Sequence, residues 1–256
     1  MRVILTHEQA DFDAIASLFG AALLEEGAIP VLPRRLNRNV RSFLTLYGAD
    51  FPFVDARDLP SGIVDAVTLV DTQSLVTLKG MNATTRVRVL DHHPVRSGLP
   101  AEWEVRAEEV GATTTLLVEQ LSNNGFDLTT LQATLLLLGI YEDTGSLTYV
   151  RTTARDARAA AYLLEAGADL RIVVRFLNPP LSPDQRLVYD QLLANAKTHL
   201  LQGYRIVIAT ADARGMSEEI SSLTHKLRDL LEPDALFVLV TTTEGTRLVA
   251  RSAADG

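Results

Sequence analysis

The chain has 256 residues, of which 47% are hydrophobic and 22% are charged, and its formal net charge at pH 7 is −8. This composition predicts a folded protein of one large or two ordinary domains rather than a disordered chain. The acidic balance disfavours a broad interface with long duplex nucleic acid, so small or single-stranded substrates fit better.

Two further features bear on location. The longest apolar stretch, residues 135–140, is too short to cross a bilayer, so we expect no membrane partner. The chain has no cysteine and therefore no disulfide framework, which makes a cytoplasmic location the default expectation.

Three short apolar runs, residues 3–6, 66–70 and 87–90, are rich in Val, Leu and Ile and alternate with helical patterns. This combination predicts the buried parallel strands of an α/β fold. Each run leads into residues of metal-binding type: His7, Asp11 and Asp13 after the first, Asp71 after the second, and Asp91, His92 and His93 after the third. Ligands of open α/β sheets bind at the carboxyl ends of strands, so we expect the three groups to meet at one edge.

The expected meeting of these groups creates an electrostatic problem. Asp11, Asp13, Asp71 and Asp91 would place four carboxylates in one crevice, and no Lys or Arg lies within the motifs. Like charges a few ångströms apart cannot all stay ionised without positive charge between them, so divalent cations are expected. Imidazole and carboxylate ligands without thiolate favour Mn, Fe, Zn or Co. Each Asp taken alone can instead be a helix cap or a turn residue.

Helical spacing of apolar residues continues the pattern along the chain. It predicts a strand at 29–32 and helices at 14–26, 38–46, 112–121, 129–141, 154–166 and 170–176. The β-α-β-α order favours right-handed crossovers and a parallel sheet. Asp143 follows the helix that ends near Tyr141 and lies beside a glycine break, a position that suits a ligand better than a core side chain.

A proline-rich segment, residues 178–183, marks the expected domain boundary, because three prolines cannot continue a helix. We predict a metal-binding domain over residues 1–180, a connector helix within 181–200, running from Ser182 to about Thr198, and a smaller α/β domain over 201–256. In this last domain we expect strands at 204–210, 235–241 and 247–250, and a helix at 217–231. It breaks off after a strand, so we expect it to be truncated or completed by another chain.

Two groups are candidates for substrate contacts. Four arginines, among them Arg38, lie within residues 34–41, where they form either a solvated helix face or guanidinium contacts to phosphates. Thr113 and its neighbours follow Gly111, and their hydroxyls either cap a helix or donate to phosphate oxygens. The sequence leaves both alternatives open.

The motifs together resemble the DHH phosphoesterase family, which is named for its Asp-His-His motif and includes RecJ-type exonucleases and nanoRNase/pAp phosphatases. The resemblance covers residues 1–180 and rests on His7-x3-Asp11-x-Asp13, Asp71, Asp91-His92-His93 and Asp143, in this order. It implies a metal-dependent hydrolase, of exonuclease or nucleotide phosphatase type, that acts on short single-stranded RNA or DNA or on small nucleotides.

The resemblance also implies two divalent ions, usually Mn²⁺, with Mg²⁺ or Co²⁺ as alternatives. The ions would share Asp71 as a bridging ligand, and the ligand sets would be His7, Asp11 and Asp71 for one ion and Asp13, Asp71, His92 and Asp143 for the other. His93 would face the scissile phosphate as a charge stabiliser or proton donor. Asp91 would orient the neighbouring histidines from outside the ligand set.

A finer resemblance connects residues 6–14, 36–41 and 111–115 with DHH modules at the front of long bacterial proteins. Those proteins carry CBS domains and a poly(A)-polymerase or tRNA-nucleotidyltransferase head. This likeness implies that the chain is an amino-terminal fragment. It also implies an alternative function as a noncatalytic or regulatory nucleotide-binding module of such a protein.

The second domain resembles the DHHA1 domain, the substrate-binding partner of DHH domains. Arg251 and Ser252 match the strand that precedes the glycine-rich segment of DHHA1. The resemblance therefore adds Arg251 and Ser252 to Thr113 and Arg38 as candidate substrate-binding residues. The apolar strand edges of this domain are compatible with a homodimer.

Overall fold

The computed structural model describes residues 1–213 and 220–252. The chain divides into two compact units, Met1–Pro179 and Pro180–Gly256. In the described residues, no helix is long and apolar enough to span a membrane.

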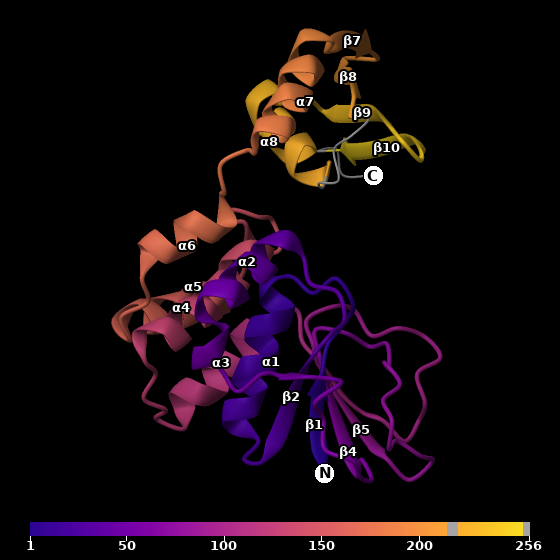
Figure 1. The fold of residues 1–256 in the computed structure, drawn as a ribbon. Helices are drawn as coiled ribbons and strands as arrows, with labels where there is room; N and C mark the ends of the chain where they lie inside the picture. The colour runs from indigo at the N-terminus through magenta and orange to yellow at the C-terminus, as the bar shows by residue number, and fades with distance from the viewer. Residues whose placement is uncertain (214–219, 253–256) are drawn as a thin grey trace. The chain divides into compact units, whose positions relative to one another are not determined.

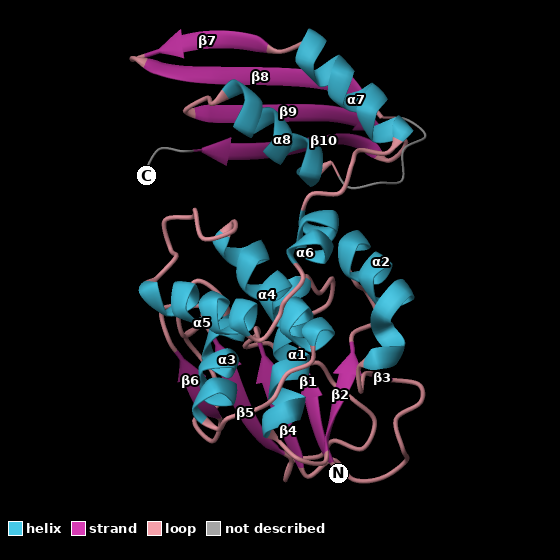
Figure 2. Cartoon of the chain, turned by 90° about the vertical axis from the view of Figure 1, so that its left-hand side faces the viewer, coloured by secondary structure: helices cyan, strands magenta, loops and turns pink. Residues whose placement is uncertain are grey.

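The first unit is an α/β fold on a six-stranded sheet, in the order β3-β2-β1-β4-β5-β6, with every neighbouring pair parallel. Figure 2 shows the helices in front of this sheet. The strands are β1 (Arg2–Leu5), β2 (Ala28–Leu32), β3 (Val54–Asp55), β4 (Ala66–Val70), β5 (Arg86–Asp91) and β6 (Glu104–Ala107). The helices are α1 (Phe12–Leu24), α2 (Arg38–Tyr47), the short 3₁₀ helix η1 (Gly48–Asp50), α3 (Thr113–Asn123), α4 (Thr130–Thr144), α5 (Ala154–Glu165) and α6 (Leu170–Leu177). The predicted parallel-sheet fold is confirmed.

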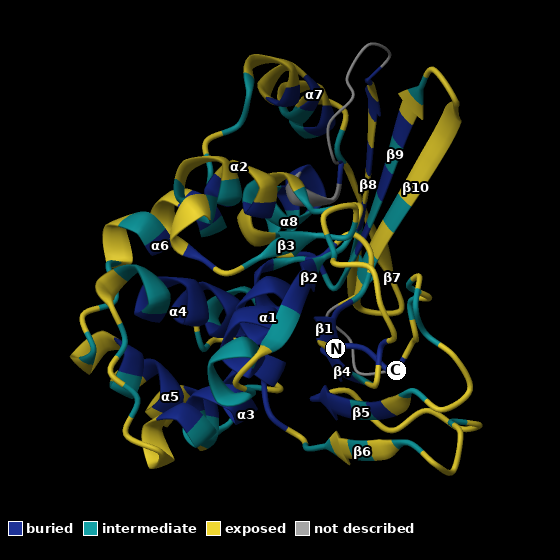
Figure 3. Ribbon diagram, turned by 60° about the horizontal axis from the view of Figure 1, so that its bottom comes forward, coloured by how far each residue is buried: buried dark blue, intermediate teal, exposed yellow. Residues whose placement is uncertain are grey.

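The two faces of this sheet are covered differently. Helices α1, α3, α4 and α5 lie on one side and long loops lie on the other (Figure 1). Ile4 of β1 packs into the helix-covered core, whereas Val3 and Leu5 belong to a smaller core under the loops. Successive side chains of a strand point to opposite faces, so a strand covered on both sides needs apolar residues at every position. Figure 3 shows α1 as a largely buried helix beside this sheet.

The second unit has a four-stranded sheet in the order β10-β9-β8-β7, in which only the central pair, β8 and β9, is parallel. Its two helices pack on the same face of the sheet (Figure 2). Val188 and Leu192 of the first helix share a core with Leu223 and Leu227 of the second. The elements are α7 (Pro183–Ala194), β7 (Lys197–Leu201), β8 (Tyr204–Asp212), α8 (Ser221–Leu231), β9 (Ala235–Thr242) and β10 (Gly245–Ser252).

Some predicted elements differ from the structure. The helix expected to reach Thr198 ends at Ala194, and Lys197–Leu201 form β7. Every residue of β7 is exposed, so no buried alternation marks it as a strand in the sequence. The edge strands β3 and β6 were missed because they are short and have no fully buried residue. Residues 217–219 of the helix expected at 217–231 lie outside the described residues.

Helix α7 packs in the core of the second unit, which begins before it at Pro180. The helix predicted as a connector is thus part of that unit's packing. The division of roles between a metal-binding domain and a substrate-binding domain stays a prediction.

Candidate metal centre

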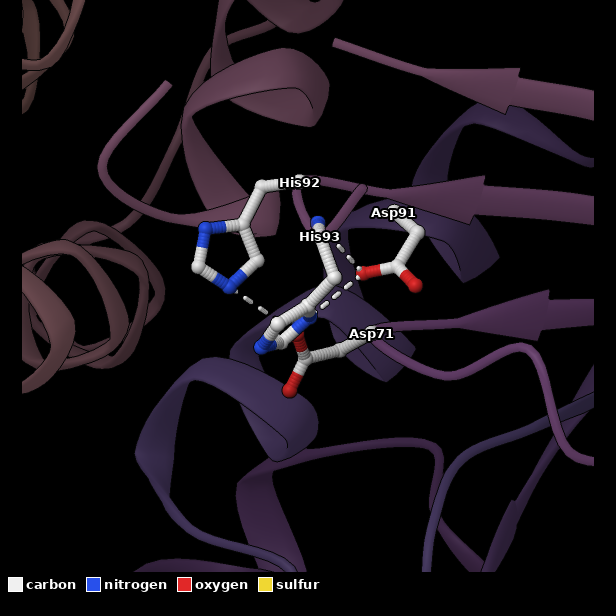
Figure 4. A group of neighbouring side chains, drawn as sticks. All are labelled: Asp71, Asp91, His92 and His93. Carbon is white, nitrogen blue, oxygen red and sulfur yellow. Dashed lines mark hydrogen bonds and ion pairs between the residues drawn. The ribbon is translucent and has the colours of Figure 1, made fainter. Parts of the chain in front are cut away.

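The strand ends bring the predicted ligands together at one edge of the six-stranded sheet. His7 follows β1, Asp71 follows β4, and Asp91 ends β5 directly before His92 and His93 (Figure 4). Three groups each place their ligand atoms within 4.8 Å of one another. These groups are His7, Asp11 and Asp71; Asp13, His92 and Asp143; and Asp71, Asp91, His92 and His93.

Asp71 belongs to both the first and the third group, and its carboxylate lies between His7 and His92. Its Oδ2 is 3.3 Å from His7 Nε2, and its Oδ1 is 3.6 Å from His92 Nε2. The Thr113 hydroxyl donates to Oδ1 at 3.0 Å. Asp71 has φ +56°, in the left-handed region that costs energy for a residue other than glycine and that clusters at functional sites. The carboxylate is held in this central position at the cost of backbone strain.

In the described residues, one ring nitrogen of His92 makes a hydrogen bond and the other makes none. Its Nδ1 is 3.2 Å from the Val110 carbonyl oxygen, so the proton on Nδ1 is donated to that oxygen. The Nε2 atom is buried, finds no hydrogen-bond partner in the described residues, and lies 3.3 Å from Asp143 Oδ2. A histidine that binds a metal usually donates its other N–H to such a carbonyl, so His92 fits a ligand through Nε2.

His7 shows the same arrangement at the end of β1. Its Nδ1 is 2.9 Å from the Glu8 carbonyl oxygen. Its Nε2 faces two carboxylates, 3.3 Å from Asp71 and 4.0 Å from Asp11. Both histidines therefore present the same nitrogen to the carboxylates.

Asp11 and Asp13 come from the start of α1. Asp11 is the N-cap and its Oδ1 accepts from Ala14 N at 3.1 Å, so the cap alternative is correct for this residue. Its position in the first group shows that a cap can also be a ligand candidate. Asp13 is fully buried and accepts from the backbone N–H groups of Thr113 and Thr114, at 2.8 and 2.9 Å. This contact fixes the carboxylate on the N-terminus of α3.

The carboxylates of the cluster resist ionisation. Burial, followed by repulsion from Asp143, raises the pKa of Asp11, and the same two causes raise the pKa of Asp13 to about 7. Burial and then Asp13 and Asp11 raise the pKa of Asp71 well above its usual range. Positive charge among these groups would relieve both the burial penalty and the repulsion.

The same carboxylates also shift the pKa of His92, in this case by attracting a proton to its ring. Burial disfavours its charged form, but the carboxylates of Asp143, Asp13 and Asp71 outweigh burial and raise the pKa of His92 to about 9. The carboxylates therefore attract a proton to the nitrogen that a cation would otherwise occupy. The buried Nε2, the oxygen-rich surroundings and the raised carboxylate pKa values together fit a divalent-metal site.

Asp91 positions His93. Its Oδ1 accepts from His93 Nδ1 at 2.8 Å, and its Oδ2 accepts from Gln73 Nε2 at 2.8 Å. Burial raises the pKa of Asp91, but the hydrogen bonds from His93 and Gln73 outweigh it, and the pKa lies below its usual value. Asp91 was expected to orient both histidines. The structure corrects this for His92, whose Nδ1 partner is Val110.

The sequence interpretation left out two residues near the site, Glu142 and Asp156, and considered Gln73 only as a possible donor to phosphate oxygens. Glu142, next to Asp143, accepts from Phe12 N, and burial followed by Asp11 raises its pKa to about 8. Gln73 anchors Asp91. Asp156 accepts from Gly111 N at 3.0 Å and from the Thr115 hydroxyl at 2.6 Å. Of the two residues left out, only Glu142 had a local signal, its position beside Asp143, because the partners of Asp156 are distant in sequence.

The predicted substrate residues are more dispersed. Arg38 is an exposed residue at the start of α2, and Thr113 has its hydroxyl proton directed at Asp71. Arg251 and Ser252 end β10 in the second unit. Their contact with a substrate stays a prediction.

A parallel α/β sheet with histidines and carboxylates at its strand ends defines a candidate divalent-metal protein. A family model described as "DHH family, N-terminal domain" matches residues 2–140, and the chain belongs to this family. The predicted family membership is confirmed.

The chain is similar to several known proteins. It is 36% identical over 260 residues to the A-adding tRNA nucleotidyltransferase of Geobacter sulfurreducens. This alignment covers 98% of this chain but 29% of that protein. It is 35% identical over 89 residues to the bifunctional oligoribonuclease and PAP phosphatase NrnA of Mycoplasma genitalium, covering 35% of this chain and 28% of that protein. The chain thus spans less than a third of the length of both relatives.

Two further similar proteins align with most of this chain, one by sequence and one by structure. A probable manganese-dependent inorganic pyrophosphatase of Brevibacillus brevis is 28% identical over 233 residues, covering 86% of this chain and 73% of that protein. The crystal structure of an exopolyphosphatase-related protein from Bacteroides fragilis aligns with a TM-score of 0.74 at 16% identity, covering 98% of this chain and 79% of that chain, and supports the fold. The chain is therefore a DHH-family protein with phosphoesterase relatives.

Proposed function

We propose that this chain is a divalent-metal-dependent phosphoesterase that hydrolyses phosphate esters of short single-stranded oligonucleotides or small nucleotides. The observation that carries the proposal is the pair of ligand groups around Asp71, with a buried histidine nitrogen that has no hydrogen-bond partner in the described residues. The similarity to an oligoribonuclease and PAP phosphatase supports the substrate class.

The residues that would hold two ions fall into two sets around Asp71. The sets are His7, Asp11 and Asp71, and Asp13, Asp71, His92 and Asp143. Two divalent cations there, Mn²⁺ by similarity to the pyrophosphatase, would supply positive charge and Lewis acidity for an in-line displacement at phosphorus.

The chain's own contribution to the reaction centres on His93. Its side chain is 52% exposed, so it is open to a substrate, while Asp91 accepts the proton on its Nδ1. This contact leaves Nε2 to face a phosphate oxygen. As a charge stabiliser or proton donor, His93 would act through Nε2 on the phosphate or on the leaving oxygen. Gln73 keeps Asp91 in place for this task.

The test is Mn²⁺-dependent hydrolysis of a panel, with metal content measured on the same sample. The panel contains pAp, 5′-labelled RNA of two to five nucleotides, cyclic di-AMP and pyrophosphate. Hydrolysis of any nucleotide member supports the proposal. Hydrolysis of pyrophosphate alone, or bound metal without turnover, contradicts it.

A second candidate function is a noncatalytic or regulatory nucleotide-binding module within a larger tRNA nucleotidyltransferase or poly(A) polymerase-like protein. It is favoured by the similarity to an A-adding tRNA nucleotidyltransferase, which extends over 98% of this chain. Under this alternative the panel would bind with Mn²⁺ but remain intact.

A further inference from the structure

A pocket of about 180 Å³ lies in the first unit at the carboxyl ends of β1 and β2. Its apolar walls include Leu5, Val31, Ala56 and Leu78. The two sequence neighbours of His7, Thr6 and Glu8, also line it. The pocket is therefore adjacent along the chain to a candidate metal ligand.

Thr6 lines this pocket, but its hydroxyl is enclosed by the protein rather than open to the pocket space. Thr6 is 3% exposed, and its Oγ1 has no hydrogen-bond partner in the described residues. A buried hydroxyl without a partner costs about 1–3 kcal/mol.

Two charged side chains add specificity to the lining. Glu8 is exposed, and one of its carboxylate oxygens accepts from Arg35 N at 3.0 Å, so the other is open to a donor from a ligand. Arg34 is also exposed, and its planar guanidinium can stack on an aromatic face. The lining thus combines apolar walls with an acceptor and a stacking cation.

We infer that this pocket takes the nucleobase of the nucleotide whose phosphate lies at the metal centre, an inference that rests on the proposed function. A cavity of about 150 Å³ accepts a benzene ring, and pockets for whole drug-sized ligands start near 300 Å³. The volume therefore suits one heterocyclic ring system rather than an entire nucleotide. A flat ring with a polar edge matches both the walls and the Glu8 carboxylate.

The experiment compares the binding of AMP and of ribose 5-phosphate by titration calorimetry in Mn²⁺. The two probes share sugar and phosphate and differ only in the base. Wild-type protein should bind AMP at least about tenfold more tightly, a difference of about 1.4 kcal/mol. Ala56→Phe, which fills the pocket, should bring this ratio close to one. Ala101→Phe, the same change at an exposed position, should leave the ratio unchanged.

A gentler variant keeps the inference testable if Ala56→Phe does not fold, which a thermal melt would show. Arg34→Ala removes the stacking guanidinium and should weaken AMP binding by about threefold to tenfold while ribose 5-phosphate binds as before. Equal affinity of the two probes for the wild type would overturn the inference. A full preference for AMP in a folded Ala56→Phe variant would do the same.

Hydrolysis of pAp is measured on the same wild-type sample to separate the two proposals. Hydrolysis together with equal affinity for AMP and ribose 5-phosphate refutes the base pocket alone. A preference for AMP without hydrolysis of any nucleotide refutes the proposed catalysis and supports the pocket.

Discussion

In the first unit all six strands run parallel, whereas the second unit has a mixed sheet with a single parallel pair. Parallel strands end at the same edge, so the polar residues that follow β1, β4 and β5 converge there. In the mixed sheet, neighbouring antiparallel strands end at opposite edges, and polar residues after them are separated. The comparison explains why the dense cluster of histidines and carboxylates belongs to the first unit.

The largest effect is expected for Asp71→Asn. This change removes charge from the residue that the two proposed ligand sets share. Metal content and Mn²⁺-dependent hydrolysis should both fall to background, a loss greater than the about 10- to 100-fold cost of removing a partner outside the ligand set. Metal analysis and the hydrolysis assay on one sample check this.

A matched change away from the cluster controls for Asp71→Asn. Asp127→Asn, at an exposed position of the first unit, should leave both quantities at the wild-type level. Two ions retained in Asp71→Asn would refute the shared-ligand role.

His93→Ala separates chemistry from metal binding at the same edge. The ring is half exposed and held by Asp91, so its loss should leave metal content near normal. Turnover should fall by about 100-fold or more, the usual range for a general acid. Metal analysis together with kcat tests this, and a parallel loss of metal would make His93 a ligand.

Leu192→Ala tests whether the two units depend on each other. Leu192 is fully buried in the core of the second unit, and such a truncation costs about 2–5 kcal/mol. We expect a lower melting temperature for the second unit while the first unit still binds Mn²⁺. Protease mapping with metal analysis reports on each unit separately. Loss of metal together with the second unit would show that the first unit needs it.

The smallest effect concerns pH and the metal-free first unit. Asp13 and Glu142 have pKa values of about 7 and 8 in the folded protein, against about 4 when unfolded. The folded state therefore binds more protons, and its stability is highest below the unfolded pKa and falls as pH rises from 5 to 8. We expect a lower melting temperature without metal at pH 8 than at pH 5.

Fluorescence of Trp103, the single tryptophan of the chain, reports on the first unit in that experiment. Saturating Mn²⁺ should remove most of the pH dependence, because cations replace the protons. Thermal melts that are identical at pH 5 and pH 8 without metal would contradict the cluster's electrostatics.

The sequence predicted the first unit more fully than the second. Buried strands such as β4 and β5 are rich in Val and Leu, and the metal-binding types of residue at their ends stand out beside them. Strand β7 is exposed along its whole length, and β6 has no fully buried residue, so neither carries such a pattern. Pairing with a neighbouring strand, which local sequence does not encode, makes these segments strands.

The same distinction applies within the metal centre. The amino-acid sequence by itself determined that histidines and carboxylates follow buried strands, because the order of residue types along a strand and past its end is local. Only the tertiary structure decided that Gln73 holds Asp91, that Val110 orients His92, and that Glu142 lies among the carboxylates. These contacts join residues 18 to more than 100 positions apart, and folding alone brings their atoms within hydrogen-bonding distance.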